Sequence, residues 1–177
     1  LEISNCNEGG GGSCGGNNRK YVSFDMSAQY STVFNTADSE MSWHFNMKES
    51  RDNPSGFGSG NYGIAVVLGA TEADLSSATV DGYAVILGES DPSPDPVRLV
   101  YFTNGIANYT SLIDIDIDAT NDYLSVNVNY DPCTGEWSMQ ARNDGASSFA
   151  DPATLSETLY TATNNTYTAT NLLYFGA

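Results

Sequence analysis

Basic residues are scarce in this sequence of 177 amino acids. Six lysines and arginines face 22 acidic residues, which gives a formal net charge of −16, and there is a single histidine. Such a charge repels nucleic acid and anionic lipid, so neither is expected as a partner. The acidic balance is compatible with divalent cations, and equally with solubility in a salty extracellular medium.

Long apolar runs and zinc-type cysteine spacings are also absent from the sequence. No stretch reaches the roughly 20 apolar residues of a transmembrane helix, so no membrane span is predicted. The three cysteines show neither Cys-x-x-Cys nor Cys/His ligand spacing, which argues against zinc. Cys6 and Cys14 flank a glycine run and are candidates for a small disulfide loop, while the odd count leaves the pairing of Cys133 open.

The chain divides into two parts of different character. Residues 1–18 are rich in glycine and are expected to form a flexible tail or linker. Residues 19–177 have the length and composition of one domain. The sequence has neither an initiator Met nor a signal peptide, so we expect a mature or partial product.

The strongest structural signal lies in residues 123–142, which read YLSVNVNYDPCTGEWSMQAR. Apolar and polar residues alternate on both sides of DPCTG, and Gly135 can take the left-handed residue of that turn without a Cβ penalty. A period of two predicts an antiparallel hairpin with one buried and one solvated face. Asn127 and Gln140 should lie outside. The residues that should be buried are Leu124, Val126, Val128, Trp137 and Met139.

Similar alternation recurs elsewhere. Residues 41–48 predict a strand with Trp43 in the core and His44 on the polar face, and the apolar runs 62–69 and 83–88 predict a pair of central strands. The connector 70–82 has room for one short helical turn around 72–76. Further strands are expected from Tyr21 onward and over 97–103, 112–118, 155–161 and 167–176. About ten strands with almost no helix predict an all-β, two-sheet antiparallel sandwich or jelly roll.

The segments NYGIAVVLGA, DGYAVILG, DPVRLVYFTNGI, YLSVNVNYDPCTGEW, FADP and NNTYTATNLLYFG follow one another along the chain. In this order they resemble a concanavalin A-like, laminin-G-like sandwich domain of secreted and cell-surface proteins of Bacteroidota. The resemblance covers the chain from about Tyr21 onward. It implies an exported bacterial protein, extracellular or at the cell surface, in which this domain is one module of a larger polypeptide.

The same resemblance bears on the end of the chain. Domains of this kind usually continue for one more strand after YFG, so the sandwich is expected to lack its last strand. The apolar run 172–175 would then lie at an open sheet edge, which is a template for pairing. Either a longer polypeptide or a neighbouring chain or domain would complete the sheet.

The alternating acids of LIDIDID are the candidate catalytic residues. Alternation would point Asp114, Asp116 and Asp118 to one face, where one could act as nucleophile and another as acid. Laminarinase-type glycoside hydrolases share the fold and carry three acids in this way. Here Asp replaces Glu at both ends of their motif, which changes the reach of the carboxyl groups, and three like charges repel one another. Catalysis is therefore the weaker alternative to a calcium site or a solvated acidic strand.

Calcium is the candidate metal, because it takes six to eight oxygen ligands and suits an acidic chain. Asp91 and Asp95 in the ESDPSPDP loop, together with Asp114 and Asp116, are the candidate ligands. Their spacing is not that of an EF-hand. Laminin-G-like and lectin sandwiches often carry calcium near the binding rim. The resemblance therefore supports a calcium site, in addition to the acidic composition.

Glycan binding is the third kind of site that the sequence suggests. Sugar sites combine an aromatic ring with amides and carboxylates, and Tyr123, Asn127, Asn129 and Gln140 all fall on the polar face of the hairpin. A tyrosine on a β surface also follows from strand propensity alone. We therefore expect a non-catalytic extracellular β-sandwich module for binding glycan or cell-surface polysaccharide, or for adhesion. The alternatives are a laminarinase-type glycoside hydrolase and a structural subunit of a cell-surface assembly.

Overall fold

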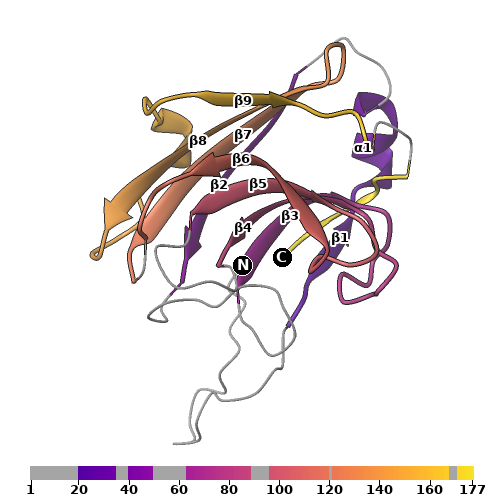
Figure 1. Cartoon of the computed structure of the whole chain (residues 1–177), viewed down its shortest axis with the longest axis horizontal. Coiled ribbons are helices and arrows are strands. Elements are labelled where there is room, and N and C mark those ends of the chain that lie inside the picture. Colours follow the sequence, from indigo (N-terminus) through magenta and orange to yellow (C-terminus); the bar gives the residue numbers. More distant parts are fainter. Residues whose placement is uncertain (1–19, 35–39, 50–62, 89–95, 120, 168–170) are drawn as a thin grey trace, which may run out of the picture.

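The computed structural model describes residues 20–34, 40–49, 63–88, 96–119, 121–167 and 171–177. This part of the chain contains ten strands, one α-helix and one 3-10 turn (Figure 1). In chain order they are β1 (Ser23–Asp25), α1 (Ser27–Val33), β2 (Met41–Lys48), β3 (Ile64–Ala70), β4 (Gly82–Leu87), β5 (Val97–Phe102), β6 (Tyr109–Ile115), β7 (Tyr123–Asp131), β8 (Glu136–Gly145), η1 (Pro152–Thr154), β9 (Tyr160–Thr163) and β10 (Tyr174–Gly176).

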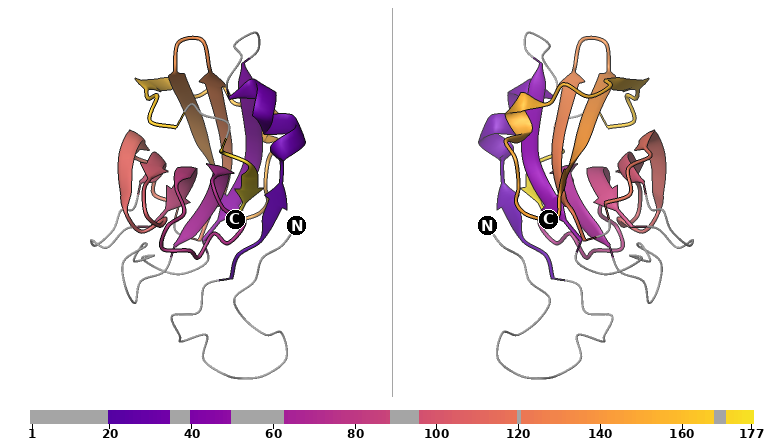
Figure 2. Two further views of the ribbon diagram at one scale, coloured as in Figure 1. Left: turned by 90° about the vertical axis from the view of Figure 1, so that its right-hand side faces the viewer. Right: turned by 90° about the vertical axis from the view of Figure 1, so that its left-hand side faces the viewer.

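The strands form two antiparallel sheets that pack face to face, as the side views show (Figure 2). One sheet has six strands in the order β1-β10-β3-β4-β5-β6, and the other has four in the order β2-β7-β8-β9. The interior between them is filled by one large apolar cluster to which both sheets contribute. The protein is therefore an all-β, two-sheet antiparallel sandwich, compatible with a jelly roll, as its alternation predicts.

The β7–β8 hairpin forms in the predicted register. Val128 lies opposite Met139, and the five apolar residues expected inside are all buried. Asn127 and Gln140 lie half-buried on the other face. Gly135 closes the turn at a φ of +70°, in the left-handed region that favours glycine.

The two apolar runs form the neighbouring strands β3 and β4 in the middle of the six-stranded sheet. Every residue of β4 is buried, because the main core covers one face and a second apolar cluster covers the other. A Cβ at Gly82 would lie 2.1 Å from the carbonyl oxygen of Gly69, so the close approach of these strands requires glycine. The predicted strand pair is confirmed.

Aromatic rings connect the two sheets within the main core. The indole of Trp137 lies 4.3 Å from the ring of Tyr130 and 4.4 Å from that of Tyr83. Trp43 of β2 stacks on Trp137 with its centroid at 5.9 Å. Because Tyr83 belongs to β4 and the other three to the four-stranded sheet, this cluster bridges the sandwich. Both tryptophans are core residues, as predicted.

The second apolar cluster lies on the outer face of the six-stranded sheet, where the segments 71–81 and 103–108 cover it with Leu75, Val80 and Ile106. The helical turn suggested for residues 72–76 does not form. Asp74 instead accepts hydrogen bonds from the backbone N–H and the hydroxyl of Ser76, at 2.9 and 2.5 Å. Such a local turn competes with helical hydrogen bonding.

Helix α1 is an element that the sequence pattern does not predict. It begins just after β1, where Asp25 accepts a 2.8 Å hydrogen bond from the N–H of Ser27. The hydroxyl of Tyr30 accepts a 3.1 Å hydrogen bond from the indole of Trp43, and Phe34 packs edge-on against Tyr30. A helix of this length is unstable alone, so these tertiary contacts decide its conformation.

The connection from β8 to β9 also differs from the prediction. A strand over 155–161 was expected, but the extended part is confined to β9 and the 3-10 turn η1 precedes it. Asp151 caps η1 by accepting a 2.9 Å hydrogen bond from the N–H of Ala153, and Pro152 begins the turn. A proline with a capping aspartate before it favours a helical turn over a strand.

The C-terminal strand does not lie at an open edge. Of the strand predicted over 167–176, only β10 pairs in a sheet, and it lies between β1 and β3. The expectation of an unpaired edge at residues 172–175 is wrong, because β1 occupies the outer side of β10 and Leu172 is buried in the main core. Whether a further strand follows in a longer polypeptide stays a prediction.

Replacing Trp137 by alanine should lower the free energy of unfolding by about 3–5 kcal/mol, because it leaves a cavity between the sheets. Urea denaturation followed by circular dichroism measures the change. Tyr160→Ala is the matched control, since that ring is 40% exposed on β9 and its loss should cost about 0.5 kcal/mol or less. Equal losses for the two variants would contradict a core that depends on the aromatic cluster.

Candidate functional site

The outer face of the four-stranded sheet brings together most of the residues predicted to bind ligand. Asn127 lies between His44 and Gln140 in the strand register, and Asn129 lies two residues further along β7. His44 is exposed, as predicted for a histidine on the polar face of β2. Three of the four candidate glycan-binding residues are therefore neighbours, held by strands whose opposite faces are anchored in the core.

One cross-strand row on this face is polar in all four strands. Ser42, Asn129, Ser138 and Thr161 pair in register from β2 to β9. The hydroxyl of Ser42 donates to Oδ1 of Asn129 at 2.6 Å, and Nδ2 of Asn129 donates to the hydroxyl of Ser138 at 3.4 Å. Together with the neighbouring row, these residues form what we call the polar strip: Ser42, His44, Asn127, Asn129, Ser138, Gln140 and Thr161. Ser138 is itself buried, and the next row toward the hairpin tip pairs Asp131 with Glu136.

The segment 146–159 crosses part of this face and bounds the polar strip. Nδ1 of His44 lies 3.4 Å from the carbonyl oxygen of Pro152, and Nε2 of Gln140 donates to the carbonyl of Glu157 at 2.6 Å. Oδ1 of Asn127 is buried beside them and accepts no hydrogen bond from the described residues. The open part of the strip therefore lies toward the hairpin tip, around Asn129.

Tyr123 does not belong to the polar strip. It begins β7, about 13 Å along the strand from Asn127. Its ring packs edge-on against Phe149 with centroids 4.3 Å apart, and Nζ of Lys48 lies 3.7 Å from its centroid. A cation–π contact and an aromatic neighbour already engage this ring, whereas Phe149 is 47% exposed. The sequence pattern did not single out Phe149, because no alternation marks a residue on this segment.

A buried ion pair anchors the start of the crossing segment. Nε of Arg142 donates to Oδ1 of Asp144 at 2.7 Å, and the hydroxyl of Ser125 and the N–H of Ala150 donate to Oδ2 at 2.6 and 2.9 Å. The Asp144 side chain is 1% exposed. Burial alone would raise the pKa of Asp144, but these hydrogen bonds and the guanidinium outweigh it and hold the pKa below 3.8. The carboxylate therefore stays charged at neutral pH and holds the segment in place.

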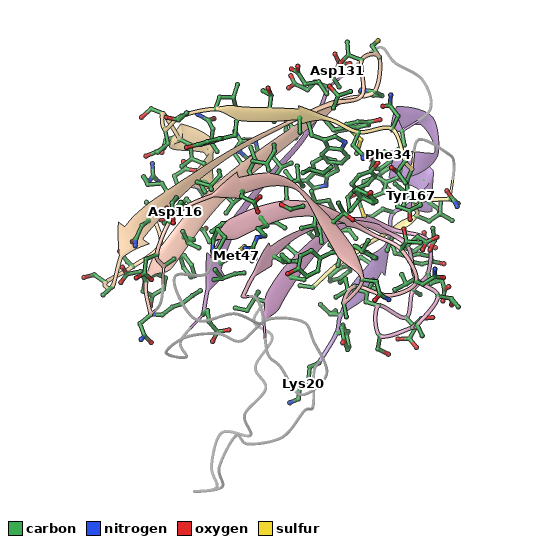
Figure 3. All side chains as sticks on the ribbon, in the orientation of Figure 1. Lys20, Phe34, Met47, Asp116, Asp131 and Tyr167 are labelled. Carbon is green, nitrogen blue, oxygen red and sulfur yellow. The ribbon has the colours of Figure 1, made fainter. Side chains whose placement is uncertain are left out.

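Only the first of the three alternating aspartates lies in a strand. Strand β6 ends at Ile115, and the N–H of Ile117 donates to the carbonyl of Ile115 at 2.9 Å, which is a turn and not an extended ladder. Asp114 accepts hydrogen bonds from Arg98 at 2.8 Å and from Ser111 at 2.7 Å. Asp116 lies beyond the strand, far from Asp131 at the hairpin tip (Figure 3). All three aspartates are exposed while Ile113 and Ile115 are buried, so exposure alternates as predicted although the strand ends at Ile115. A catalytic role of these acids stays a prediction.

Two of the four proposed calcium ligands, Asp114 and Asp116, lie among the described residues. Oδ1 of Asp114 is taken by Arg98 and Ser111, and the described ranges hold no cluster of three or more His, Cys, Asp and Glu side chains suited to a metal ion. The other proposed ligands, Asp91 and Asp95, lie outside the described residues. Calcium binding by these aspartates together stays a prediction.

The cysteine predictions and the predicted tail fall largely outside the described residues. Cys6 and Cys14, like the whole of residues 1–18, are among those that the structure does not describe. Cys133 lies exposed at the hairpin tip, where its N–H donates to Oδ1 of Asp131 at 2.8 Å. The disulfide between the first two cysteines stays a prediction.

The fold and its outer face define a class: a two-sheet antiparallel β-sandwich with a polar surface on one sheet. Comparison with known proteins found no matching family model, no matching curated protein and no matching solved structure. Over the ranges that the structure describes, no helix has the length and apolar character needed to cross a membrane.

Asp144→Asn should loosen the crossing segment and cost about 1–3 kcal/mol at neutral pH, because a charged acceptor of three hydrogen bonds is removed. The pKa of Asp144 is lower in the folded protein than its ordinary value of 3.8. The contribution of its carboxylate to the free energy of unfolding is therefore complete above pH 3.8 and is lost as the pH falls through the lowered pKa. Urea unfolding between neutral and strongly acidic pH measures this, and amide exchange at Ala150 should quicken in the variant.

Asp116→Asn is the matched control. Asp116 is exposed and makes no hydrogen bond or ion pair in the described part of the chain. It should change the free energy of unfolding by less than about 0.5 kcal/mol. A wild-type acid profile that Asp144→Asn leaves unaltered would show that another carboxyl group is responsible.

Proposed function

We propose that this protein is a non-catalytic, extracellular β-sandwich module that binds glycan or cell-surface polysaccharide through the polar strip and so serves in surface adhesion. The observation that carries the proposal is the row Ser42, Asn129, Ser138 and Thr161, which is polar and uncharged across all four strands. It lies on a chain with a net charge of −16. An uncharged patch on so acidic a protein suits a ligand that is itself polar and uncharged.

The chemistry of the strip matches that of sugar hydroxyls. Serine and threonine hydroxyls can both donate and accept, and the asparagine and glutamine amides offer donors and acceptors side by side. A hydroxyl group of a sugar needs both, since it can donate one hydrogen bond and accept two. Four adjacent strands span roughly 14 Å, which is wide enough for contacts with more than one unit of a chain.

Rigid support of the strip also favours binding. Its residues alternate with Trp43, Val128, Trp137 and Met139, which are buried in the main core. Ser42, Asn129 and Ser138 already hydrogen-bond to one another, so little side-chain entropy remains to be lost when a ligand binds. A surface that is preorganised in this way loses less conformational entropy when it binds a flexible, well-hydrated polymer.

The location and context that we propose come from the sequence motifs. Their resemblance to concanavalin A-like, laminin-G-like domains of Bacteroidota surface proteins supports an exported module, extracellular or at the cell surface, in a larger polypeptide. The acidic composition supports a salty extracellular medium. A neighbouring chain or domain that extends one of the sheets is compatible with this setting.

The glycoside hydrolase hypothesis predicts turnover of β-glucans. We expect no such turnover. Hydrolysis needs two carboxyl groups on either side of the scissile bond, whereas Asp114 is bonded to Arg98 and the chain turns after Ile115. Incubation with laminarin and mixed-linkage β-glucan, followed by a reducing-sugar assay, should show no release above buffer. Activity that disappears in Asp116→Asn would replace the binding proposal with the hydrolase.

Asn129→Ala should weaken glycan binding by about tenfold or more, because it removes the amide at the centre of the row, and about 1.4 kcal/mol corresponds to tenfold. A glycan array identifies ligands for the wild type, and isothermal titration calorimetry then compares the variants. Asn171→Ala is the matched control, since Asn171 is exposed, lies outside the strip and makes no hydrogen bond within the described residues.

The outcome separates glycan binding from a purely structural role. Wild-type affinity in Asn171→Ala with a loss in Asn129→Ala supports the strip as the binding surface. Equal affinity for both variants would place the glycan elsewhere on the protein. Failure of the wild type to bind any glycan would favour the structural subunit of a surface assembly.

A further inference from the structure

We propose that a second site, on the opposite side of the sandwich from the polar strip, binds a single neutral sugar unit or a similarly small, uncharged, hydroxyl-bearing group. It is a pocket of about 230 Å³ over the outer face of the six-stranded sheet, and we call it the loop pocket. Three separate segments contribute its described lining: Tyr21 before β1, Leu75–Ala78 between β3 and β4, and Asn104–Asn108 between β5 and β6.

Hydrogen bonds tie these segments to one another, so the pocket is formed before any ligand binds. The N–H of Gly105 donates to the carbonyl of Val80 at 2.8 Å, and the N–H of Asn104 donates to Oδ1 of Asp81 at 2.8 Å. The hydroxyl of Ser23 in β1 donates to the carbonyl of Ala73 at 2.7 Å. Each bond joins two of the three segments or their immediate neighbours, and binding therefore requires little ordering of the chain.

The shape of the turn depends on its backbone conformation. Asn104 and Gly105 both have positive φ, +56° and +100°, which asparagine and glycine tolerate better than other residues. Nδ2 of Asn108 donates to the carbonyl of Asn104 at 2.6 Å and closes the turn. This bond occupies the donor side of the Asn108 amide, while its Oδ1 makes no hydrogen bond within the described chain.

The lining combines an apolar base with groups that can bind hydroxyls. Leu75 and Ile106 are buried, and Tyr21 is 38% exposed and offers an aromatic surface. The Tyr21 hydroxyl and the Asn104 amide have no hydrogen-bond partner among the described residues. A sugar ring has apolar C–H faces and polar edges, so it can contact the base and the amides together. A wholly apolar ligand would leave these polar groups unpaired, at a cost of about 1–3 kcal/mol each.

Charge and size narrow the ligand class further. None of the described lining residues is acidic or basic, although the chain carries 22 acidic residues. An anion would meet the repulsion of the net charge, and a cation entering the pocket would find no carboxylate to replace its water. The volume lies below the roughly 300–1,000 Å³ of pockets for drug-sized ligands, which suits one sugar unit.

The loop pocket goes beyond the proposed function because it adds a second site of different geometry. The polar strip is open and extends across four strands, whereas the pocket is small and built from loops on the other sheet. Two sites on opposite sides of one module can hold two glycan chains at once, which is a requirement for cross-linking. Multivalent contacts of this kind raise avidity without stronger individual sites.

The test is a titration of the isotope-labelled full chain with neutral monosaccharides, a hexose, a deoxyhexose and an N-acetylhexosamine, followed by amide chemical shifts. We expect shifts at residues 75–78 and 104–108 that saturate. Tyr21→Ala should weaken this binding by about tenfold, equivalent to about 1.4 kcal/mol. Asn104→Gly should weaken it as well, because it removes the amide and keeps a residue that adopts positive φ freely.

Phe24→Ala is the matched control for Tyr21→Ala. Phe24 is 46% exposed on the adjoining strand β1 and does not line the pocket. Its loss should leave the monosaccharide affinity unchanged. If Phe24→Ala and Tyr21→Ala weaken binding equally, a general disturbance of β1 is responsible and the pocket assignment is overturned.

Three further outcomes would overturn the inference. A uronic acid that binds as tightly as its neutral hexose would contradict the neutral ligand class. Shifts confined to residues 127–129 and 138–140 would leave the polar strip and the proposed function intact and exclude the loop pocket. The titration is carried to concentrations at which weak lectin-like binding saturates. If no described residue shifts, the loop pocket does not bind these sugars and the inference is wrong. The glycan array would then test the proposed function separately.

Discussion

The contact between Tyr83 and Trp137 is the interaction on which the rest of the structure depends. It joins the middle of the six-stranded sheet to the middle of the four-stranded sheet, with ring centroids 4.4 Å apart. Trp137 in turn stacks on Tyr130 and Trp43. Aromatic residues from three strands of the four-stranded sheet are therefore linked to Tyr83 of the six-stranded sheet. Because the two sheets have no shared strand, this packing decides how they are placed relative to each other.

The polar ends of the same two rings hold the last part of the chain. The hydroxyl of Tyr83 donates to Oδ1 of Asn164 at 2.6 Å and accepts a hydrogen bond from the N–H of Tyr167 at 3.1 Å. The indole of Trp137 donates to the carbonyl of Asn164 at 3.3 Å. Burial raises the pKa of Tyr83, so its hydroxyl keeps its proton and remains a donor. One aromatic pair thus joins the sheets and positions residues 164–167 after β9.

This core also explains how an acidic protein can present two uncharged surfaces. Inward residues of β2, β7 and β8 are apolar, so their outward neighbours are free to be serine, asparagine, glutamine and threonine. The carboxylate of Asp144 is buried with Arg142 below the crossing segment, and Asp114 pairs with Arg98 on β5. These pairs neutralise two acids of the sheets, whereas Asp131 and Glu136 lie in the row beside Asn129 and Ser138 at the hairpin-tip end of the strip.

Much of the fold could be predicted from period-two alternation. Val128 and Trp137 are buried and Asn127 lies outward because strand residues point to alternate faces, whatever the neighbouring strands are. The continuous run of β4 likewise predicted burial on both faces. Helix α1 could not be predicted in this way, because a helix of this length is unstable alone and contacts such as that of Tyr30 with Trp43 stabilise it.

The candidate sites, like the fold, could be predicted from the sequence only in part. Asn127, Asn129 and Gln140 could be assigned to one polar face from the sequence, since they belong to one hairpin with one turn. Ser42 and Thr161 could not be added, because they come from strands whose register with β7 and β8 only the pairing of distant segments decides. Tyr123 shares the face but not the site, and Asp116 and Asp118 lie beyond the end of β6 at Ile115.

The sequence by itself therefore determined the class of the protein, the register of the central hairpin and the polar character of its outer face. These follow from interactions between residues that are near one another in the chain. Only the tertiary structure decided which strands extend the polar row, that residues 146–159 cover part of it, and that Tyr21 meets Asn104 and Ser77 at one pocket. Such features depend on contacts between segments far apart in sequence, and alternation carries no information about which segments will meet.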